Sequence, residues 1–400
     1  MPSLSPLLDH FKPSAIAGMM RTVAQLQAEG RKLYDFSTGE PDFDTPEHIK
    51  QAAIEAIRRG ETKYSPTDGT IAVRSAVQRK FERENNLAFN LEQIIVATGA
   101  KPLLADIIRT MASHGDEIVL AAPCWPSHVG MIELAGAAPV FVTTSQGDGF
   151  IMKTDQLDRA ITAKTRAVLL CAPSNPTGAV YCRKTLHDIA EVLRKHPDIW
   201  IITDDLYEHI LYDNREFISL LEVAPDLANR CIVVNGVSKA YAMTGWRIGY
   251  AAGPQILIDA VRKIMSQATG CPCSISQAAA IAALDGPRDC VYGFVQAYQA
   301  RRDRSVLSLN QTPGIDCMSP EGAFYFYPSC AGVIGTRSRD GTLIGSSQDF
   351  ANYLLTRWSV AVVPGNAFEL DPHFRISMAT ADGDLDEGIA RIKQAVFELS

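Results

Sequence analysis

The sequence has no run of about 18 consecutive apolar residues, the length that a membrane-spanning helix requires. Its first segment, Met1–Met20, carries charges and prolines in place of a continuous apolar stretch, so we expect no signal peptide. Cationic residues are too few for a nucleic-acid-binding footprint, because 38 Lys and Arg stand against 45 Asp and Glu, with a net charge of -7. These absences predict a protein that binds neither a membrane nor nucleic acid.

The sequence also lacks the cysteine spacing of a disulfide-rich or zinc-binding protein. Its nine cysteines are odd in number and scattered, and Cys271 and Cys273 form the only closely spaced pair. We therefore expect no metal site. We interpret the cysteines as reduced thiols of a cytoplasmic protein, where they serve as small buried apolar side chains.

What is present is the composition of an ordinary globular enzyme, with 46% hydrophobic and 21% charged residues. At about 150 residues per domain, a chain of 400 residues suggests two or three domains, or one large and one small domain.

Strand and helix patterns alternate from about residue 45 to residue 285. The strand segments are short, apolar and rich in β-branched residues, as expected for strands that helices cover on both faces. Such alternation predicts an α/β fold with a mainly parallel sheet. The predicted strands are Ile94–Thr98, Glu117–Ala121, Ala138–Thr143, Ala167–Cys171, Trp200–Thr203, Cys231–Asn235 and Gly245–Ala252.

The pattern changes after residue 286. A long helix from Arg288 to about Asn310 is followed by short strands and by a final amphipathic helix over Leu385–Leu399, which predicts a smaller α+β domain. We therefore expect an N-terminal arm with part of the small domain at residues 1–44, a large domain at residues 45–285 and a small C-terminal domain at residues 286–400.

The most informative stretch is Gly236–Gly249, which follows the predicted strand Cys231–Asn235. Lys239 lies there among small and apolar residues, where desolvation would lower its pKa and favour a neutral, nucleophilic amine. Such an amine forms an imine with an aldehyde. Arg247 follows eight residues later, and its guanidinium suits a phosphate. Taken singly, Lys239 could be a surface lysine and Arg247 a helix-capping cation.

The whole stretch Gly236–Gly249 resembles the lysine signature of class I aminotransferases. The chain as a whole resembles fold-type I enzymes of the aminotransferase class I/II family, in particular aspartate aminotransferase-like members from bacteria. The resemblance implies a large domain with a mainly parallel seven-stranded sheet, which binds pyridoxal 5'-phosphate as a Schiff base on Lys239, and a smaller α+β domain. In one departure, many relatives carry a hydroxyl where this chain has Gly236, and Ser238 is expected to substitute for it in part.

The resemblance extends to two strand ends upstream. Asp204 would meet the protonated pyridine nitrogen, and Tyr207 would hydrogen-bond the phenolic oxygen of the cofactor. Asn175 would bind the same oxygen and lie beside the substrate carboxylate. Without the resemblance, Asp204 would be an ordinary helix cap and the Asn-Pro dipeptide at Asn175 an ordinary turn.

The turn after Ile94–Thr98 matches the phosphate-binding step of the family. Gly99, Ala100 and Lys101 open a helix there, and backbone N–H groups at a helix start can hold a phosphate, although such turns are common without one. Tyr64 matches a tyrosine that reaches the phosphate of the neighbouring subunit, which implies a homodimer with shared active sites.

Four residues besides Asn175 are expected around the substrate. Trp125 matches the aromatic residue that stacks on the cofactor ring, Arg375 the arginine that binds the α-carboxylate, and Gly39 a residue whose backbone faces that carboxylate. Lys101 matches a lysine that meets the distal carboxylate of aspartate or glutamate in some relatives. The alternatives are core packing for Trp125, a surface charge for Arg375 and a solvent-facing Lys101. His128 could line the pocket, but a lone histidine is more often structural.

These residues together predict an aminotransferase that moves the amino group of an L-amino acid to a 2-oxo acid such as 2-oxoglutarate. We expect aspartate or glutamate as the donor, with aromatic amino acids as an alternative. Arg375 and Asn175 would bind the substrate carboxylate, Asp204 would keep the ring protonated, and Lys239 would be the general base.

Three rival functions remain open at this point. A pyridoxal-phosphate-dependent C–S lyase, β-lyase or aminocyclopropane-carboxylate-forming lyase would share the same residues. A pyridoxal-phosphate-binding transcriptional regulator would need a DNA-binding domain, and only about 35 residues precede Gly39. The motifs at Arg375 and Trp125 argue against an acyl-CoA-dependent synthase of the same fold.

Overall fold

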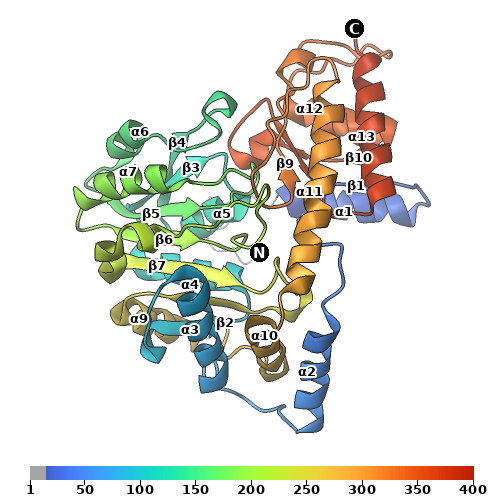
Figure 1. Cartoon of the computed structure of the whole chain (residues 1–400). Coiled ribbons are helices and arrows are strands. Elements are labelled where there is room, and N and C mark those ends of the chain that lie inside the picture. The colour runs from blue at the N-terminus through green and yellow to red at the C-terminus, as the bar shows by residue number, and fades with distance from the viewer. Residues whose placement is uncertain (1–14) are drawn as a thin grey trace, which may run out of the picture.

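The computed structural model describes residues 15–400 (Figure 1). The predicted N-terminal arm, Met1 to about Pro13, lies outside the described residues. No helix within the described range is long and apolar enough to cross a membrane.

A seven-stranded sheet with the order β2-β8-β7-β6-β5-β3-β4 forms the centre of the molecule. Its strands are parallel except for β8, which runs antiparallel to both β2 and β7. The predicted mainly parallel α/β sheet is therefore confirmed. The strands are β2 (Ile94–Ala97), β3 (Glu117–Ala122), β4 (Ala138–Thr143), β5 (Thr165–Cys171), β6 (Trp200–Asp204), β7 (Cys231–Gly236) and β8 (Gly249–Ala252).

The sequence prediction was wrong about where β8 begins. A strand was expected from Gly245, but Thr244–Trp246 forms a 3-10 turn and Arg247 has a positive φ of 55°, so regular pairing starts only at Gly249. The apolar residues before Gly249 pack as a turn, which a hydrophobic pattern alone does not distinguish from a strand.

Helices cover both faces of this sheet, as the alternation of buried side chains in β2 shows. Ile94 and Val96 point to the face covered by α3, α7 and α10, whereas Ile95 and Ala97 point to the face covered by α4, α5 and α9. The helices of this half are α2 (Glu47–Arg58), α3 (Ile71–Asn85), α4 (Ala100–Met111), α5 (Pro126–Leu134), α6 (Thr154–Ala160), α7 (Arg183–Arg194), α8 (Leu220–Val223), α9 (Gln255–Met265) and α10 (Ser274–Asp285).

The C-terminal elements form a second apolar core together with the N-terminal segment. Strand β1 pairs in parallel with β10, and Tyr34 and Phe36 are buried in the same cluster as Phe350 and Phe374. Figure 1 shows α1 and β1 beside the C-terminal helices. This packing supports the proposed division into a large domain and a small domain that the N-terminal segment joins. The elements are α1 (Ala15–Ala28), β1 (Tyr34–Asp35), α11 (Asp289–Asn310), β9 (Tyr325–Phe326), α12 (Ser347–Trp358), β10 (Val360–Ala361), β11 (Val363–Pro364), β12 (Phe374–Ser377) and α13 (Asp382–Phe397).

Candidate active site

The carboxyl ends of the parallel strands open into a cavity of about 460 Å³ that the small sheet β11-β12-β9 closes on the opposite side. Ligands of open α/β sheets bind at this edge. Most of the residues singled out from the sequence meet in this one cavity: Gly39, Ala100, Lys101, Trp125, Asn175, Asp204, Tyr207, Ser238, Lys239, Arg247 and Arg375.

Lys239 lies just beyond the end of β7, and its amine points into the cavity. Its Nζ donates a hydrogen bond to the backbone oxygen of Gly39 at 2.6 Å. Burial lowers the pKa of Lys239 to about 8, and the positive charges of Arg375 and Arg247 act in the same direction. A substantial fraction of this amine is therefore neutral and nucleophilic near pH 8.

Asp204 is the last residue of β6. One oxygen of its carboxylate has a hydrogen-bond partner among the described residues and the other has none. Oδ2 lies 2.9 Å from Nε2 of His128, whose side chain is fully buried. Oδ1 is buried and has no hydrogen-bond partner among the described residues. A buried carboxylate oxygen without a partner is costly, so this atom is suited to a donor that a ligand supplies.

His128 supports Asp204, a role that the sequence did not predict. It sits one helical turn after Trp125 on α5, and the two rings meet edge to face with centroids 5.2 Å apart. The spacing of three residues was the available signal, because it places both rings on one side of the helix. The histidine thus orients Asp204 from behind the cavity.

Arg375 is held in a defined orientation by hydrogen bonds and ring contacts. Its guanidinium donates to Oδ1 of Asn175 at 3.1 Å and to the backbone oxygen of Ser37 at 2.5 Å. It also lies between two rings, 4.5 Å from the centroid of Tyr325 and 5.1 Å from that of Phe368. Only 1% of the residue is exposed, so this arginine is not a surface charge. A buried, oriented guanidinium suits bidentate binding of a carboxylate.

A cradle for an anion lies at the start of α4. Gly99 has a φ of 96°, and a Cβ atom there would lie 2.4 Å from the guanidinium of Arg247. A Cβ atom on Gly249 would lie 2.2 Å from the backbone nitrogen of Ala100. The two glycines therefore let Arg247 approach the free N–H groups at the helix start, an arrangement that binds phosphate.

Lys101 follows in the first turn of α4 and also lines the cavity. Its Nζ lies 5.6 Å from the centre of the Trp125 ring. Burial, together with the charge of Arg247, lowers the pKa of Lys101. The residue is exposed, and it borders the cavity on the side of the Trp125 ring.

The comparisons with known proteins agree with this arrangement. The sequence profile of the family described as aminotransferase class I and II matches residues 31–392. The chain belongs to this family.

The relatives of this aminotransferase resemble it over their whole length. An aspartate aminotransferase of Rhizobium meliloti (strain 1021) is 48% identical over 377 residues, which cover 94% of this chain and 92% of that protein. An aspartate/prephenate aminotransferase of Cereibacter sphaeroides is 46% identical over 400 residues, with both proteins covered completely.

Solved structures give the same result for the fold. The crystal structure of the Rhizobium meliloti aspartate aminotransferase superposes with a TM-score of 0.97 at 46% identity, covering 100% of both chains. The Thermus thermophilus aspartate aminotransferase with maleate superposes with a TM-score of 0.92 at 36% identity, covering 99% of this chain and 100% of that one. The aminotransferase therefore has the predicted fold type.

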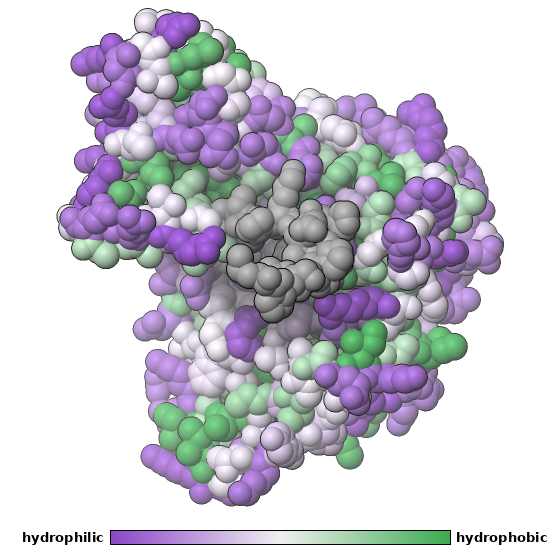
Figure 2. Space-filling model, turned by 180° about the vertical axis from the view of Figure 1, so that it is seen from behind, coloured by the Kyte–Doolittle hydropathy of each residue, from purple (hydrophilic) through white to green (hydrophobic). Residues whose placement is uncertain are grey.

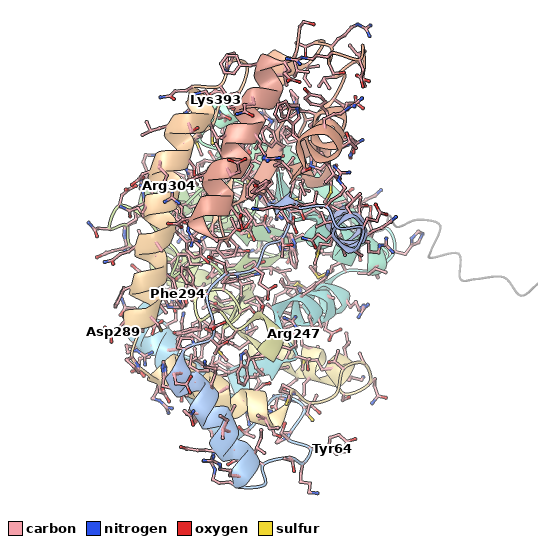
Figure 3. All side chains as sticks on the ribbon, turned by 90° about the vertical axis from the view of Figure 1, so that its right-hand side faces the viewer. Tyr64, Arg247, Asp289, Phe294, Arg304 and Lys393 are labelled. Carbon is pink, nitrogen blue, oxygen red and sulfur yellow. The ribbon has the colours of Figure 1, made fainter. Side chains whose placement is uncertain are left out.

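Two of the predicted site residues do not line the cavity. Gly99 acts through the close approach that it allows. Tyr64 is 99% exposed, and Figure 3 places it at the outer edge of the molecule, away from Arg247.

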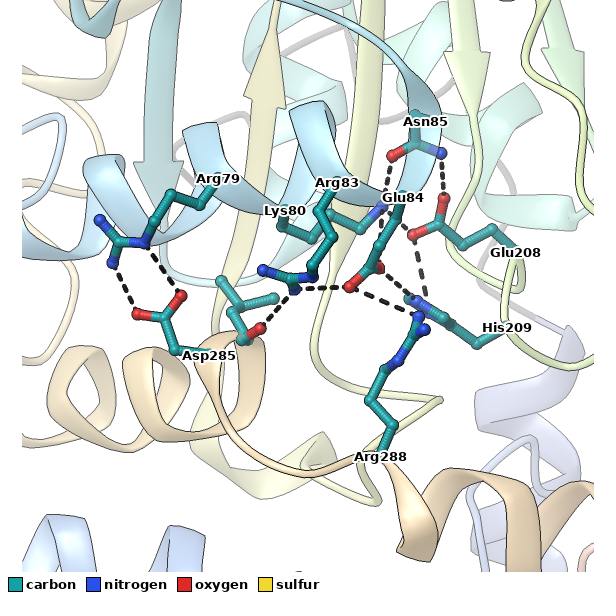
Figure 4. A network of polar contacts seen from close by, with 10 residues as sticks. Arg79, Lys80, Arg83, Glu84, Asn85, Glu208, His209, Asp285 and Arg288 are labelled. Atoms are coloured by element: carbon teal, nitrogen blue, oxygen red, sulfur yellow. Dashed lines mark hydrogen bonds and ion pairs between the residues drawn. The ribbon is translucent and has the colours of Figure 1, made fainter.

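A buried ion-pair network holds the loop that carries Tyr207 (Figure 4). The next residue, Glu208, pairs with Lys80, and neither side chain is more than slightly exposed. Asn85 completes the group, accepting from Nζ of Lys80 at 2.7 Å and donating to Glu208 at 2.8 Å. The aminotransferase thus anchors the end of β6 to α3 by buried charges.

Glu84 and His209 extend this network toward the surface. Nε2 of His209 lies 2.8 Å from Glu84. Burial alone would raise the pKa of Glu84, but the hydrogen bond to His209 and the nearby charge of Lys80 lower it to about 2. Glu84, Glu208 and His209 come within 4.8 Å of one another, as metal ligands do. Cationic side chains already neutralise both carboxylates, which favours a structural role: Lys80, Arg83 and Arg288.

Replacing Lys80 with methionine is expected to lower the free energy of unfolding by about 3–5 kcal/mol, because Glu208 is left buried without its cation. Urea unfolding at a fixed protein concentration measures the change. The double variant Lys80→Met/Glu208→Gln is the control and should recover part of the loss. A free energy of unfolding for Lys80→Met within about 1 kcal/mol of that of the unaltered protein would contradict a structural role for this ion pair.

Proposed function

We propose that this aminotransferase carries pyridoxal 5'-phosphate in the 460 Å³ cavity and transfers the amino group of aspartate or glutamate to a 2-oxo acid. The observation that carries the proposal is the convergence in this cavity of a buried amine, an unpaired carboxylate oxygen and an anion cradle. The amine is that of Lys239, the carboxylate oxygen is that of Asp204, and the anion cradle is formed by Arg247 and the start of α4.

The residues fit the cofactor group by group. Gly99 and Gly249 allow Arg247 to lie close to the start of α4, and this arrangement suits the phosphate of the cofactor. Ser238 lines the same cavity. The free Oδ1 of Asp204 suits the N–H of its protonated pyridine ring. The amine of Lys239 suits its aldehyde. Trp125, Tyr207 and Asn175 are the proposed contacts of the ring face and the phenolic oxygen.

When bound, pyridoxal phosphate supplies a cationic ring that withdraws electrons from the substrate α-carbon. Asp204 keeps the ring nitrogen protonated, and His128 fixes the orientation of that carboxylate. Arg375 and Asn175 would bind the substrate α-carboxylate and so hold the substrate, with its α-hydrogen, in the cavity that Lys239 shares. Nζ of Lys239 removes this proton, for which a pKa of about 8 is well matched to neutral pH.

The preference for an acidic amino acid rests on Lys101 and on the relatives. Lys101 borders the cavity, where pairing with a distal carboxylate would be charge-assisted. The close relatives bear the names aspartate and aspartate/prephenate aminotransferase, and the Thermus thermophilus structure includes maleate, a dicarboxylate. Prephenate also has two carboxylates and a 2-oxo group, so we propose it as a second acceptor to test beside 2-oxoglutarate.

Replacing Lys101 with methionine is expected to lower kcat/KM for aspartate by about 10- to 100-fold, since a hydrogen bond to a charged group contributes about 1.5–3 kcal/mol. Methionine nearly keeps the length of the stem and removes the amine, with both its charge and its hydrogen-bond donors. Steady-state rates with phenylalanine are the control and should change less than about threefold. An equal loss with both donors would contradict a role in side-chain selection.

An absorbance titration of the purified protein tests the function as a whole. Visible cofactor absorbance that falls with aspartate or glutamate and returns with a 2-oxo acid supports the proposal. Ammonia and a 2-oxo acid formed without any acceptor would indicate the C–S or β-lyase instead. The comparisons favour the aminotransferase over the regulator.

We also propose a homodimer in which Tyr64 reaches the phosphate of the partner's cofactor. Tyr64 and two apolar residues of α2, Ile54 and Ile57, are exposed. In Figure 2, hydrophobic residues gather over the region of α2. Size-exclusion chromatography with light scattering would test the assembly.

The cytoplasmic location is a proposal too. It is supported by the cysteines, all nine of which are free thiols in the structure.

A further inference from the structure

Tyr325 was not singled out from the sequence, yet it touches three residues of the proposed machinery. It lies on β9, where it pairs with Ser377 of β12, and it is 1% exposed. Its hydroxyl lies 2.7 Å from the hydroxyl of Tyr207, which comes from the loop after β6. One hydrogen bond thus joins the seven-stranded sheet to the three-stranded sheet across the cavity.

The ring and the hydroxyl of Tyr325 have separate contacts. The ring packs against the guanidinium of Arg375, with 4.5 Å between Cζ and the ring centroid. The hydroxyl lies against Gly39, where a Cβ atom would come within 2.5 Å of it. The backbone oxygen of Gly39 in turn accepts the hydrogen bond of Lys239. Tyr325 therefore touches both the carboxylate-binding arginine and the segment that holds the lysine amine.

The proton arrangement of the two phenols follows from their burial. Burial raises the pKa of both Tyr207 and Tyr325, so each keeps its proton at neutral pH. One of these protons lies in the hydrogen bond between them, and the other needs a different acceptor. If Tyr325 donates, the proton of Tyr207 is free for an acceptor in the cavity, and an anionic oxygen of a bound ligand is a strong one.

We propose that Tyr325 is a positioning residue whose hydroxyl donates to Tyr207 and directs the Tyr207 proton toward the phenolic oxygen of the bound cofactor, while its ring orients Arg375. This inference rests on the proposed function and extends it to a residue outside the motifs. The same side chain thereby aligns the cofactor oxygen with the carboxylate-binding guanidinium.

The variant Tyr325→Phe separates the two roles, because it removes the hydroxyl and keeps the ring. In the holoenzyme, the pH midpoint of the visible cofactor absorbance is expected to rise by about half to one pH unit, since Tyr207 becomes a weaker donor to the anionic oxygen. Maleate should bind within about twofold of its original Kd, because Arg375 keeps its stacking ring.

Further variants make the test specific. In a protein that already carries Tyr207→Phe, adding Tyr325→Phe should shift the midpoint no further, because the Tyr325 hydroxyl then has no Tyr207 hydroxyl to act through. Tyr325→Leu removes the ring as well, and should weaken maleate binding about 3- to 30-fold. Tyr327→Phe is the matched control, because Tyr327 lies two residues along the same chain segment and its hydroxyl bonds only backbone oxygens. It should leave the midpoint unchanged.

An unchanged or lowered midpoint in Tyr325→Phe would overturn the inference, as would an equal shift in Tyr327→Phe. Thermal melting of the cofactor-free variants shows whether folding is affected. If the unaltered protein had no visible cofactor absorbance with added pyridoxal phosphate, the proposed function itself would fail, so the two failures are distinguishable.

Discussion

Alanine in place of Lys239 is expected to abolish amino-group transfer and the visible absorbance of the bound cofactor. The variant loses both the amine that holds the aldehyde and the general base, and proton transfer alone contributes about 10²- to 10⁴-fold to the rate. The buried amine hydrogen-bonds Gly39 and has a pKa lowered to about 8, and no other described lysine shares this position. Coupled assays with aspartate and absorbance scans measure the two losses.

A second measurement uses the pH dependence of the same group. Because only the neutral amine attacks an aldehyde, the rate at which cofactor-free protein captures pyridoxal phosphate should rise with pH and level off above about pH 8. Lys153→Ala, at an exposed lysine paired with Asp148, is the control and should keep full activity. Retained turnover in Lys239→Ala would refute the mechanism.

Exchanging Arg375 for lysine is expected to lower kcat/KM for aspartate about 100- to 1,000-fold, although the charge is kept. Lysine cannot reproduce the planar fork or the packing on the rings of Tyr325 and Phe368. One of two hydrogen bonds to the carboxylate, about 1.5–3 kcal/mol, and the ring contacts, about 0.5–2 kcal/mol, are therefore lost. The visible cofactor absorbance should remain, because the role proposed for Arg375 is to bind the substrate and not the cofactor.

The control for this variant is Arg304→Lys, at a partly exposed arginine that pairs with Asp386 outside the cavity. Steady-state kinetics and the Kd of maleate should be unaffected there. A Kd for maleate that Arg375→Lys leaves unchanged would remove this arginine from the carboxylate site.

The site could be predicted from the sequence where its residues follow strands. Asp204 ends β6, and Lys239 comes shortly after β7. Since parallel strands end at one edge, strand-end motifs that lie far apart in the chain meet in space. The long helix α11 was likewise predicted almost to the residue. That these residues act as proposed stays a prediction.

What the sequence could not reveal is which side chains meet across long separations. His128 and its partner Asp204 are 76 positions apart, and Tyr207 and Tyr325 are 118 positions apart. The spacing from Trp125 places His128 on the same side of the helix, but nothing in the local sequence shows that its partner is a carboxylate. The pairing of Lys80 with Glu208 is hidden for the same reason, because buried charges resemble surface charges in a sequence.

The antiparallel strand β8 constrains the length of the segment that joins it to β7. Gly249 pairs with Gly236 on one side and with Ala97 on the other, so the chain returns at once to the edge that it has just left. A parallel strand would need a crossover of about a dozen or more residues before it could contribute there. One short contiguous segment therefore supplies both Lys239 and Arg247, and its length fixes the span between amine and guanidinium. A substitution at Lys239 or Arg247 changes one of these two groups and leaves the other in place. Inserting or deleting a single residue between them would instead change the distance between the amine and the guanidinium.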